Sequence, residues 1–169
     1  MIMQQIWKDQ IEWDDPLKAE TLRSWLSTSR LCDASDKAYA ATLYLRTTSE
    51  TGHISTHLLL AKTKVAPVKF VTLPRKELCG AELLAKLIST FLSQVNFDKC
   101  NLHLWTDSTI VLSRLQKHPS HWTTFVANRI TSIVEKVGND KWRHVSSKDN
   151  PADLGSRGLT AKDLICNDL

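Results

Sequence analysis

Two β-capable stretches in the first half of the chain, separated by a turn sequence, predict a β-hairpin with one strand before it. Residues 38–46 read AYAATLYLR and residues 53–65 read HISTHLLLAKTKV, joined by the turn-like sequence TTSETGH. Aromatic and β-branched residues on both sides of such a turn are typical of paired antiparallel strands. Leu31 and Cys32 are the only clear apolar residues before Asp33. The first strand therefore either recruits the polar sequence STSR or is shortened.

Apolar residues spaced three and four apart predict helices along the rest of the chain. A long helical pattern covers residues 72–95, with Thr72 and Pro74 at its start, and the buried strand NLHLW follows it. Helical patterns in STIVLSRLQK and WTTFVANRITSIVEKVG precede the short strand WRHV, and NPADLGSRG and TAKDLICNDL form the last helical turns. The resulting order, β-β-β-α-β-α-α-β-α, predicts an α/β domain.

A chain of 169 residues suits one domain. The first residues of the chain differ in pattern from the rest. The sequences MIMQQIWKDQIEW and PLKAETLRSWLS read as two short helical pieces interrupted at DDP, where the proline suits the first turn of a helix. We therefore divide the chain into a leading segment over residues 1–29, a domain over residues 30–165 and a tail over residues 166–169.

Composition argues against several classes of protein. The four cysteines show no C-x-x-C spacing and no adjacent histidine cluster, which argues against a zinc site and favours free thiols in a reducing compartment. No apolar run approaches the ~20 residues of a membrane span, and the first residues lack signal-peptide architecture. We therefore expect an intracellular protein, cytoplasmic or nuclear, without a membrane partner. Its net charge of +4 tolerates a polyanion as partner without requiring one.

Acidic residues at the ends of predicted strands are the first candidates for chemistry. Asp33 ends the first predicted strand and Asp107 follows NLHLW. Open α/β sheets bind their ligands at the carboxyl ends of strands, so the two carboxylates fit a shared site. A role as helix N-cap remains an alternative for Asp107.

The helix predicted over residues 75–95 contains two glutamates, which the apolar pattern separates. At roughly 100° per residue, Glu77 falls inside the apolar stripe, whereas Glu82 lies at its margin and is expected to be a solvated surface residue. The stripe consists of Leu78, Ala81, Leu84, Ala85, Ile88, Leu92 and Val95. A glutamate on the core-facing side needs a compensating charge or metal. The helix dipole explains the position of Glu77 along the helix but not its face.

A fourth acid comes from SSKDNPADLGSRG. Asp149 fits the turn chemistry of the following Asn-Pro pair, whereas Asp153 lies in the first turn of a short helix and is better placed to reach a site. Four acids without a matching set of histidines or cysteines suggest a hard cation such as Mg²⁺. Two such ions about 3.5–4 Å apart can clamp the attacking and leaving oxygens of a phosphoryl displacement.

Five segments together resemble one known family. They are LCDASDKAYAATLYLR, KVAPVKFVTLPRKELCGAELLAKL, LWTDSTIVLSRLQ, WTTFVANRI and WRHVSSKDNPADLGSRG. In this order they are similar to the ribonuclease H-like region that follows the reverse transcriptase in BEL/Pao retrotransposon polyproteins. MQQIWKDQIEWDDPL also resembles the tail of that reverse transcriptase, so residues 1–29 are interpreted as a remnant of it. In the family, an integrase region follows.

The resemblance implies a ribonuclease H-like fold, in which a five-stranded mixed sheet is flanked by helices and the central first strand is parallel to the fourth. Here the first strand looks truncated. The resemblance also implies catalytic and metal-binding roles for Asp33, Glu77, Asp107 and Asp153, with two Mg²⁺ ions, or Mn²⁺, as cofactors. Some ribonucleases H use a histidine before the last aspartate. His144 lies in a strand-like segment instead and is not expected to be its equivalent.

Three functions remain open. The first is a metal-dependent endonuclease that cuts the RNA strand of RNA–DNA hybrids, with the reverse transcriptase and integrase regions of its parent polyprotein as further partners. The second is a catalytically inactive nucleic-acid-binding or structural remnant, which a truncated first strand would favour. The third is a retroelement aspartic peptidase, a description sometimes applied to Pao-type segments. Neither Asp33 nor Asp107 begins the Asp-Thr/Ser-Gly turn of such peptidases, and long helices do not suit their small all-β fold.

Overall fold

The computed structural model describes residues 27–48, 52–94, 101–160 and 162. The helical pieces predicted before residue 27 and most of the last predicted helix lie outside these residues. Within the described part, no helix is long and apolar enough to span a membrane.

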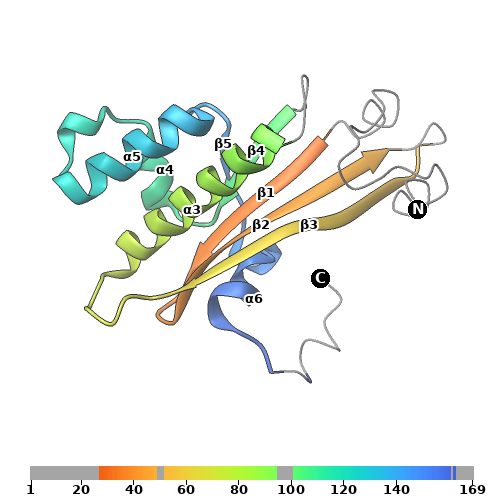
Figure 1. Cartoon of the computed structure of the whole chain (residues 1–169), viewed down its shortest axis with the longest axis horizontal. Helices are drawn as coiled ribbons and strands as arrows, with labels where there is room; N and C mark the ends of the chain where they lie inside the picture. Colours follow the sequence, from red (N-terminus) through yellow and green to blue (C-terminus); the bar gives the residue numbers. More distant parts are fainter. Residues whose placement is uncertain (1–26, 49–51, 95–100, 161, 163–169) are drawn as a thin grey trace.

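A five-stranded mixed sheet forms the centre of the described structure, with strand order β3-β2-β1-β4-β5 (Figure 1). The central strand β1 pairs antiparallel with β2 and parallel with β4, β2 pairs antiparallel with β3, and β4 pairs parallel with β5. The strands are β1 Ser27–Ala34, β2 Ala38–Thr48, β3 Ile54–Val65, β4 Asn101–Thr106 and β5 Trp142–His144. The predicted fold class, including a central first strand parallel to the fourth, is confirmed.

The first strand is not truncated, which corrects the expectation from its few apolar residues. β1 has eight residues and takes in the whole of STSR. All of them pair with β2, and the first six also pair with β4. Strand pairing uses backbone groups, so a polar sequence between two partner strands forms a regular ladder. Arg30 from this polar stretch is fully buried.

Three helices cover one face of the sheet: α3 Leu73–Gln94, α4 Thr109–Leu115 and α5 Thr124–Val137 (Figure 1). Their apolar side chains pack against Cys32, Ala41 and Leu104 in one core cluster. Gly138 is the C-cap of α5, because it has φ 74° and its N–H binds the Val134 carbonyl.

The short helix α6, Ala152–Arg157, lies on the opposite face (Figure 1). It packs on β2, β1 and, more weakly, β3. A Cβ added to Gly155 would lie 3.0 Å from Ala40 Cβ, so α6 sits close to the sheet. Because α6 has six residues, it covers only part of this face. The remainder, which we call the open face, carries Ser29, Leu31, Tyr44, Thr56, Leu58 and Trp105.

One irregularity interrupts the pairing of β2 with β3. Leu60 pairs with Leu43 and Leu58 pairs with Tyr44, so Leu59 is an extra residue without a partner in the register. Such a β-bulge reverses the alternation of faces along the strand that contains it. Leu58 therefore shares the open face with Tyr44, whereas Leu60 shares the helical face with Leu43.

Candidate active site

Asp33 lies near the carboxyl end of β1 and faces α6. Its side chain is 6% exposed and accepts a short hydrogen bond from the hydroxyl of Ser156 on α6. The same corner is fixed by Asn150, whose Nδ2 donates to the Cys32 carbonyl at 3.1 Å, and by Ser35, whose hydroxyl donates to the Ser156 carbonyl at 2.6 Å. Strand β1 and helix α6 are thus joined by hydrogen bonds around one carboxylate.

Helix α3 passes close to the backbone of Asp33. A Cβ added to Gly80 would lie 3.0 Å from the Asp33 carbonyl oxygen, so only glycine permits this approach without a shift. Glu77 lies one turn earlier on the same helix. Its Oε2 accepts a hydrogen bond of 2.6 Å from the Ser108 hydroxyl, which in turn accepts the Val111 N–H as N-cap of α4. Glu77 is therefore tied to the residue that follows Asp107.

Asp107 directly follows β4, between that strand and α4. Its Oδ2 accepts a hydrogen bond of 2.7 Å from Ser147, in the loop after β5. The N-cap of α4 is Ser108 and not Asp107, which removes the capping alternative. His144 is the last residue of β5, as its strand-like sequence predicted. Its Nε2 lies 3.2 Å from the Asp107 carbonyl oxygen.

Asp153 lies in the first turn of α6 and binds Arg157 one turn later. The Asp153 Oδ1 to Arg157 Nε distance is 2.6 Å. Ser156 links this residue to Asp33, because its hydroxyl is also 3.1 Å from the Asp153 carbonyl oxygen. Asp149, the alternative fourth acid, lies in a separate turn and is exposed.

The charges of these acids act on one another. Burial raises the pKa of Asp33 from 3.8 to about 6; the charges of Asp107 and Asp153 raise it further, against the hydrogen bond from Ser156, which lowers it. The pKa of the Cys32 thiol is also raised, first by burial and then by Asp107, Asp33 and Glu77. All four acids thus lie near the carboxyl end of β1.

The carboxylates have the chemistry that a hard divalent cation requires, because they are all oxygen ligands. Their arrangement is not a ready metal site, since no group of three or more His, Cys, Asp or Glu among the described residues could hold an ion as placed. Instead, each carboxylate is bound to a donor of the protein: Asp33 to Ser156, Glu77 to Ser108, Asp107 to Ser147 and Asp153 to Arg157. The chemistry of the donor set, four carboxylates, is of the kind that a divalent cation takes.

These donors are functional candidates that the sequence pattern did not reveal. Only Ser108 carried a usable signal, because a serine directly before an apolar helical pattern is typical of an N-cap. Ser147, Ser156 and Arg157 approach the acids only through the tertiary fold or through one turn of α6. Asn150 was read as part of a turn, yet it is 2% exposed and holds the end of β1.

Glu82 differs from its predicted role. Its side chain is 17% exposed and lies 2.7 Å from Lys86 and 3.4 Å from Arg129, so it is not a solvated surface residue. Arg129 also stacks on Phe125, with 3.6 Å between its Cζ and the ring centroid. Glu82 therefore joins α3 to α5 and stays apart from the four acids.

The fold is that of ribonuclease H. The N-terminal RNase H domain of a Mycobacterium tuberculosis protein superposes with a TM-score of 0.53 at 10% identity, covering 84% of this chain and 99% of the other. LC11-RNase H1, isolated from compost and solved in complex with an RNA/DNA hybrid, gives 0.50 at 16% identity, covering 82% and 98%. At this level of identity, the similarity establishes the fold alone.

Residues 28–108 match the family described as the Pao retrotransposon-like RNaseH-like domain. The matched segment runs from β1 to the N-cap of α4, and contains Asp33, Glu77 and Asp107. This match confirms the resemblance predicted from the sequence motifs. No curated protein sequence matches the chain.

Proposed function

We propose that this domain hydrolyses the RNA strand of RNA–DNA hybrids, with Asp33, Glu77, Asp107 and Asp153 as its catalytic and metal-binding residues. The observation that carries this proposal is electrostatic: the charges of Asp107 and Asp153 act on Asp33, and the charge of Glu77 acts with those of Asp107 and Asp33 on the adjacent Cys32. Burial raises the pKa of Asp33, and the negative charges of Asp107 and Asp153 raise it further, so its ionised form is costly. A bound divalent cation would offset that cost.

The four acids would hold two Mg²⁺ ions, for which Mn²⁺ can substitute. The ions supply an activated water and stabilisation of the leaving 3′ oxygen. The residues of the chain keep the carboxylates together: Ser108 and Ser147 orient Glu77 and Asp107, and Asn150 holds the strand end that carries Asp33.

The substrate class that we propose is supported by one similar structure. LC11-RNase H1 is described in complex with an RNA/DNA hybrid, which supports a hybrid as the substrate here. A hybrid is read through its shape and its 2′-hydroxyl groups, so base-specific contacts are not required. The reverse transcriptase and integrase regions of a retrotransposon polyprotein are the proposed partners in the same chain, and the proposed setting is the cytoplasm or nucleus.

Cleavage of a labelled hybrid in Mg²⁺ tests the assignment. We expect Asp107→Asn to lower the rate about 100-fold or more, since one charged group at the reacting phosphate is lost. Asp149→Asn is the matched control, because Asp149 is an exposed acid of a neighbouring loop. Equal cleavage by the wild type and Asp107→Asn would contradict the proposal.

A second candidate function is a binding domain without catalysis. It is favoured by the carboxylates being engaged by serines and an arginine, with no ready metal site among the described residues. The earlier reason for it, a truncated first strand, no longer applies. Calorimetric titration separates the two: a folded protein that binds hybrid but neither Mg²⁺ nor Mn²⁺ is a binding domain. The peptidase alternative loses its basis, because the described fold is not a small all-β domain.

A further inference from the structure

Lys76 is a buried lysine in the first turn of α3. It is 5% exposed, although a lysine is almost never buried unless a partner compensates its charge. Its Nζ lies 2.6 Å from Oδ1 of Asp36, whose own side chain is 94% exposed. The ion pair thus joins the helix that carries Glu77 to the turn that follows the strand of Asp33.

The turn between β1 and β2, residues 35–37, is also bound by two other parts of the chain. The Ser35 hydroxyl donates to the Ser156 carbonyl of α6 at 2.6 Å. The Lys37 carbonyl accepts the N–H of Ala66, the residue after β3, at 2.8 Å. Figure 1 shows this turn and the start of α3 at the same end of the sheet. The turn is therefore held at once by α3, by α6 and by the chain after β3.

Lys76 and Gly80 lie about one turn apart on the same side of α3, since residues four apart in a helix are neighbours on its surface. Gly80 packs on the backbone of Asp33, where an added Cβ would lie 3.0 Å from the carbonyl oxygen. Glu77 comes between these two contacts in the chain and directly follows Lys76. The ion pair and the glycine contact together hold the start of α3, and with it Glu77, on the end of β1.

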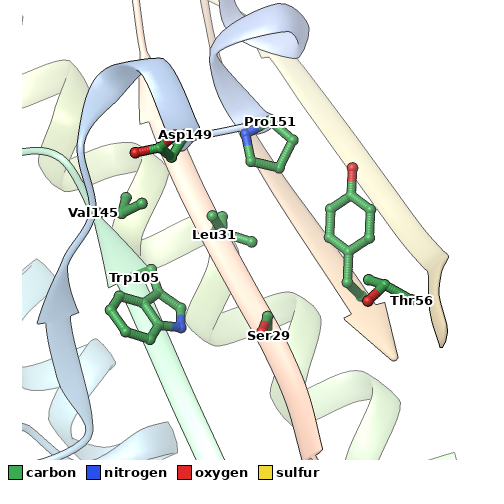
Figure 2. Close-up of a pocket in the computed structure, with 8 residues that line it drawn as sticks. Ser29, Leu31, Thr56, Trp105, Val145, Asp149 and Pro151 are labelled. Carbon is green, nitrogen blue, oxygen red and sulfur yellow. The ribbon is translucent and has the colours of Figure 1, made fainter. Parts of the chain in front are cut away.

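The opposite face of β1 is held by contacts of its own. Leu31 of β1 is 7% exposed. Figure 2 shows it in a pocket that is also lined by Val145, Asp149 and Pro151. Asn150, from the same segment, donates to the Cys32 carbonyl. The segment that leads into α6 is thus held on β1 without α3, so loss of the ion pair would act on the side of α3.

Given the function proposed above, we propose that Lys76 and Asp36 are positioning residues that keep Glu77 in place beside Asp33 for the shared cation. Neither side chain is a ligand of the cation in this proposal. Removal of the Asp36 carboxylate would leave the buried ammonium without this compensating charge, which is costly. Removal of the ammonium would untie the start of α3 from the turn.

Calorimetric titration with Mn²⁺ tests this role, because it measures the site without cleavage. We expect Asp36→Asn and Lys76→Met each to bind Mn²⁺ about tenfold more weakly than the wild type, as is usual when a group that orients metal ligands is lost. Asp36→Glu keeps the carboxylate and should keep most of the affinity. Lys76→Met leaves no buried charge, so it tests the contact even where Asp36→Asn fails to fold.

Cleavage of the hybrid gives a second measurement. Because Lys76 is buried, Lys76→Met should lower kcat and leave KM for the hybrid unchanged, which marks an interaction that acts on the reacting state alone. An unchanged kcat with a raised KM would contradict a positioning role.

Lys86→Met is the matched control, because it removes a different ion pair of α3, that with Glu82. It should bind Mn²⁺ like the wild type, while circular dichroism verifies that each variant folds. Wild-type affinity in a folded Lys76→Met variant would overturn this proposal alone, as would an equal loss in Lys86→Met. A wild type that binds no Mn²⁺ would overturn the proposed function as well.

Discussion

At Asp33, burial and neighbouring charge act on the same carboxylate. The side chain is 6% exposed, lies near Asp107 and Asp153, and has one hydroxyl donor, Ser156. Its ionised form is therefore costly while no cation is present. A carboxylate whose surroundings disfavour its charge is a candidate functional group, which agrees with the catalytic role proposed for Asp33.

The pH dependence of stability should reveal this cost. Folding raises the pKa of Asp33 from 3.8 to about 6, so between these values the folded state binds a proton that the unfolded state has lost. The stabilising contribution of the protonated group is full below pH 3.8 and is lost as the pH rises through about 6. In chelator, Asp33→Asn should lack this decline in the urea midpoint, whereas Asp149→Asn should retain it. Parallel curves for Asp33→Asn and the wild type would refute the shift.

Ser156→Ala should destabilise the domain by removing the donor to Asp33. Ser156 is 1% exposed, so its hydroxyl is shielded from water. A hydrogen bond to a charged group contributes about 1.5–3 kcal/mol. Denaturant unfolding at neutral pH measures the loss. Ser113→Ala, at an exposed position of α4, should change the free energy of unfolding by less than about 0.5 kcal/mol. A loss no larger than that of the control would mean that the hydroxyl does not support Asp33.

At the scale of single residues, the sequence singled out four acids, whose catalytic role stays a prediction, but it did not single out the side chains that bind them. Glu77 could be singled out from its face of the helix, because local periodicity sets that face. Ser147 and Ser156 could not be singled out, because they meet Asp107 and Asp33 only after the sheet brings distant segments together. Glu82 was misjudged for the same reason: its partner Arg129 lies on another helix.

Among elements, the contact of α3 with β1 sets the distance between Glu77 and Asp33. Gly80 allows the helix to approach the strand backbone, and Cys32 lies in the core between them. The helices and the hairpin were predicted because their periodicity is local. The extent of β1 was not, because the pairing of STSR with β2 and β4 depends on backbone groups of both neighbours.

Gly80→Ala tests that contact. Alanine favours a helix over glycine by about 1 kcal/mol. The new Cβ would lie 3.0 Å from the Asp33 carbonyl oxygen, which belongs to the backbone of a central strand and cannot easily yield. Overpacking of this kind costs about 1–3 kcal/mol, so we expect a net loss of stability. Thr90→Ala, at an exposed position of the same helix, should be neutral or slightly stabilising. A stabilised Gly80→Ala variant would show that the two elements can separate freely.

For the whole molecule, cation binding should couple to folding, because the four acids come from distant parts of the chain. A cation at 100 times its dissociation constant would stabilise the folded state by about 2.7 kcal/mol. Thermal unfolding with and without Mn²⁺ measures this gain. Asp153→Asn should lose most of it and Asp149→Asn should keep it. An equal gain in both variants would place the cation elsewhere.

The bulge at Leu59 has a consequence for how the length of the chain can vary. If Leu59 were absent, Leu58 and Leu60 would be adjacent in the chain. They would still pair with the adjacent residues Tyr44 and Leu43, as in a regular ladder. Removal of a residue at any regular position of β3 would instead turn the side chains on one side of it to the opposite face. Loss of the residue at position 59 should therefore leave every other side chain of β3 on its present face of the sheet. Among related chains, we expect single-residue deletions in this strand to occur at position 59 and not at its other positions.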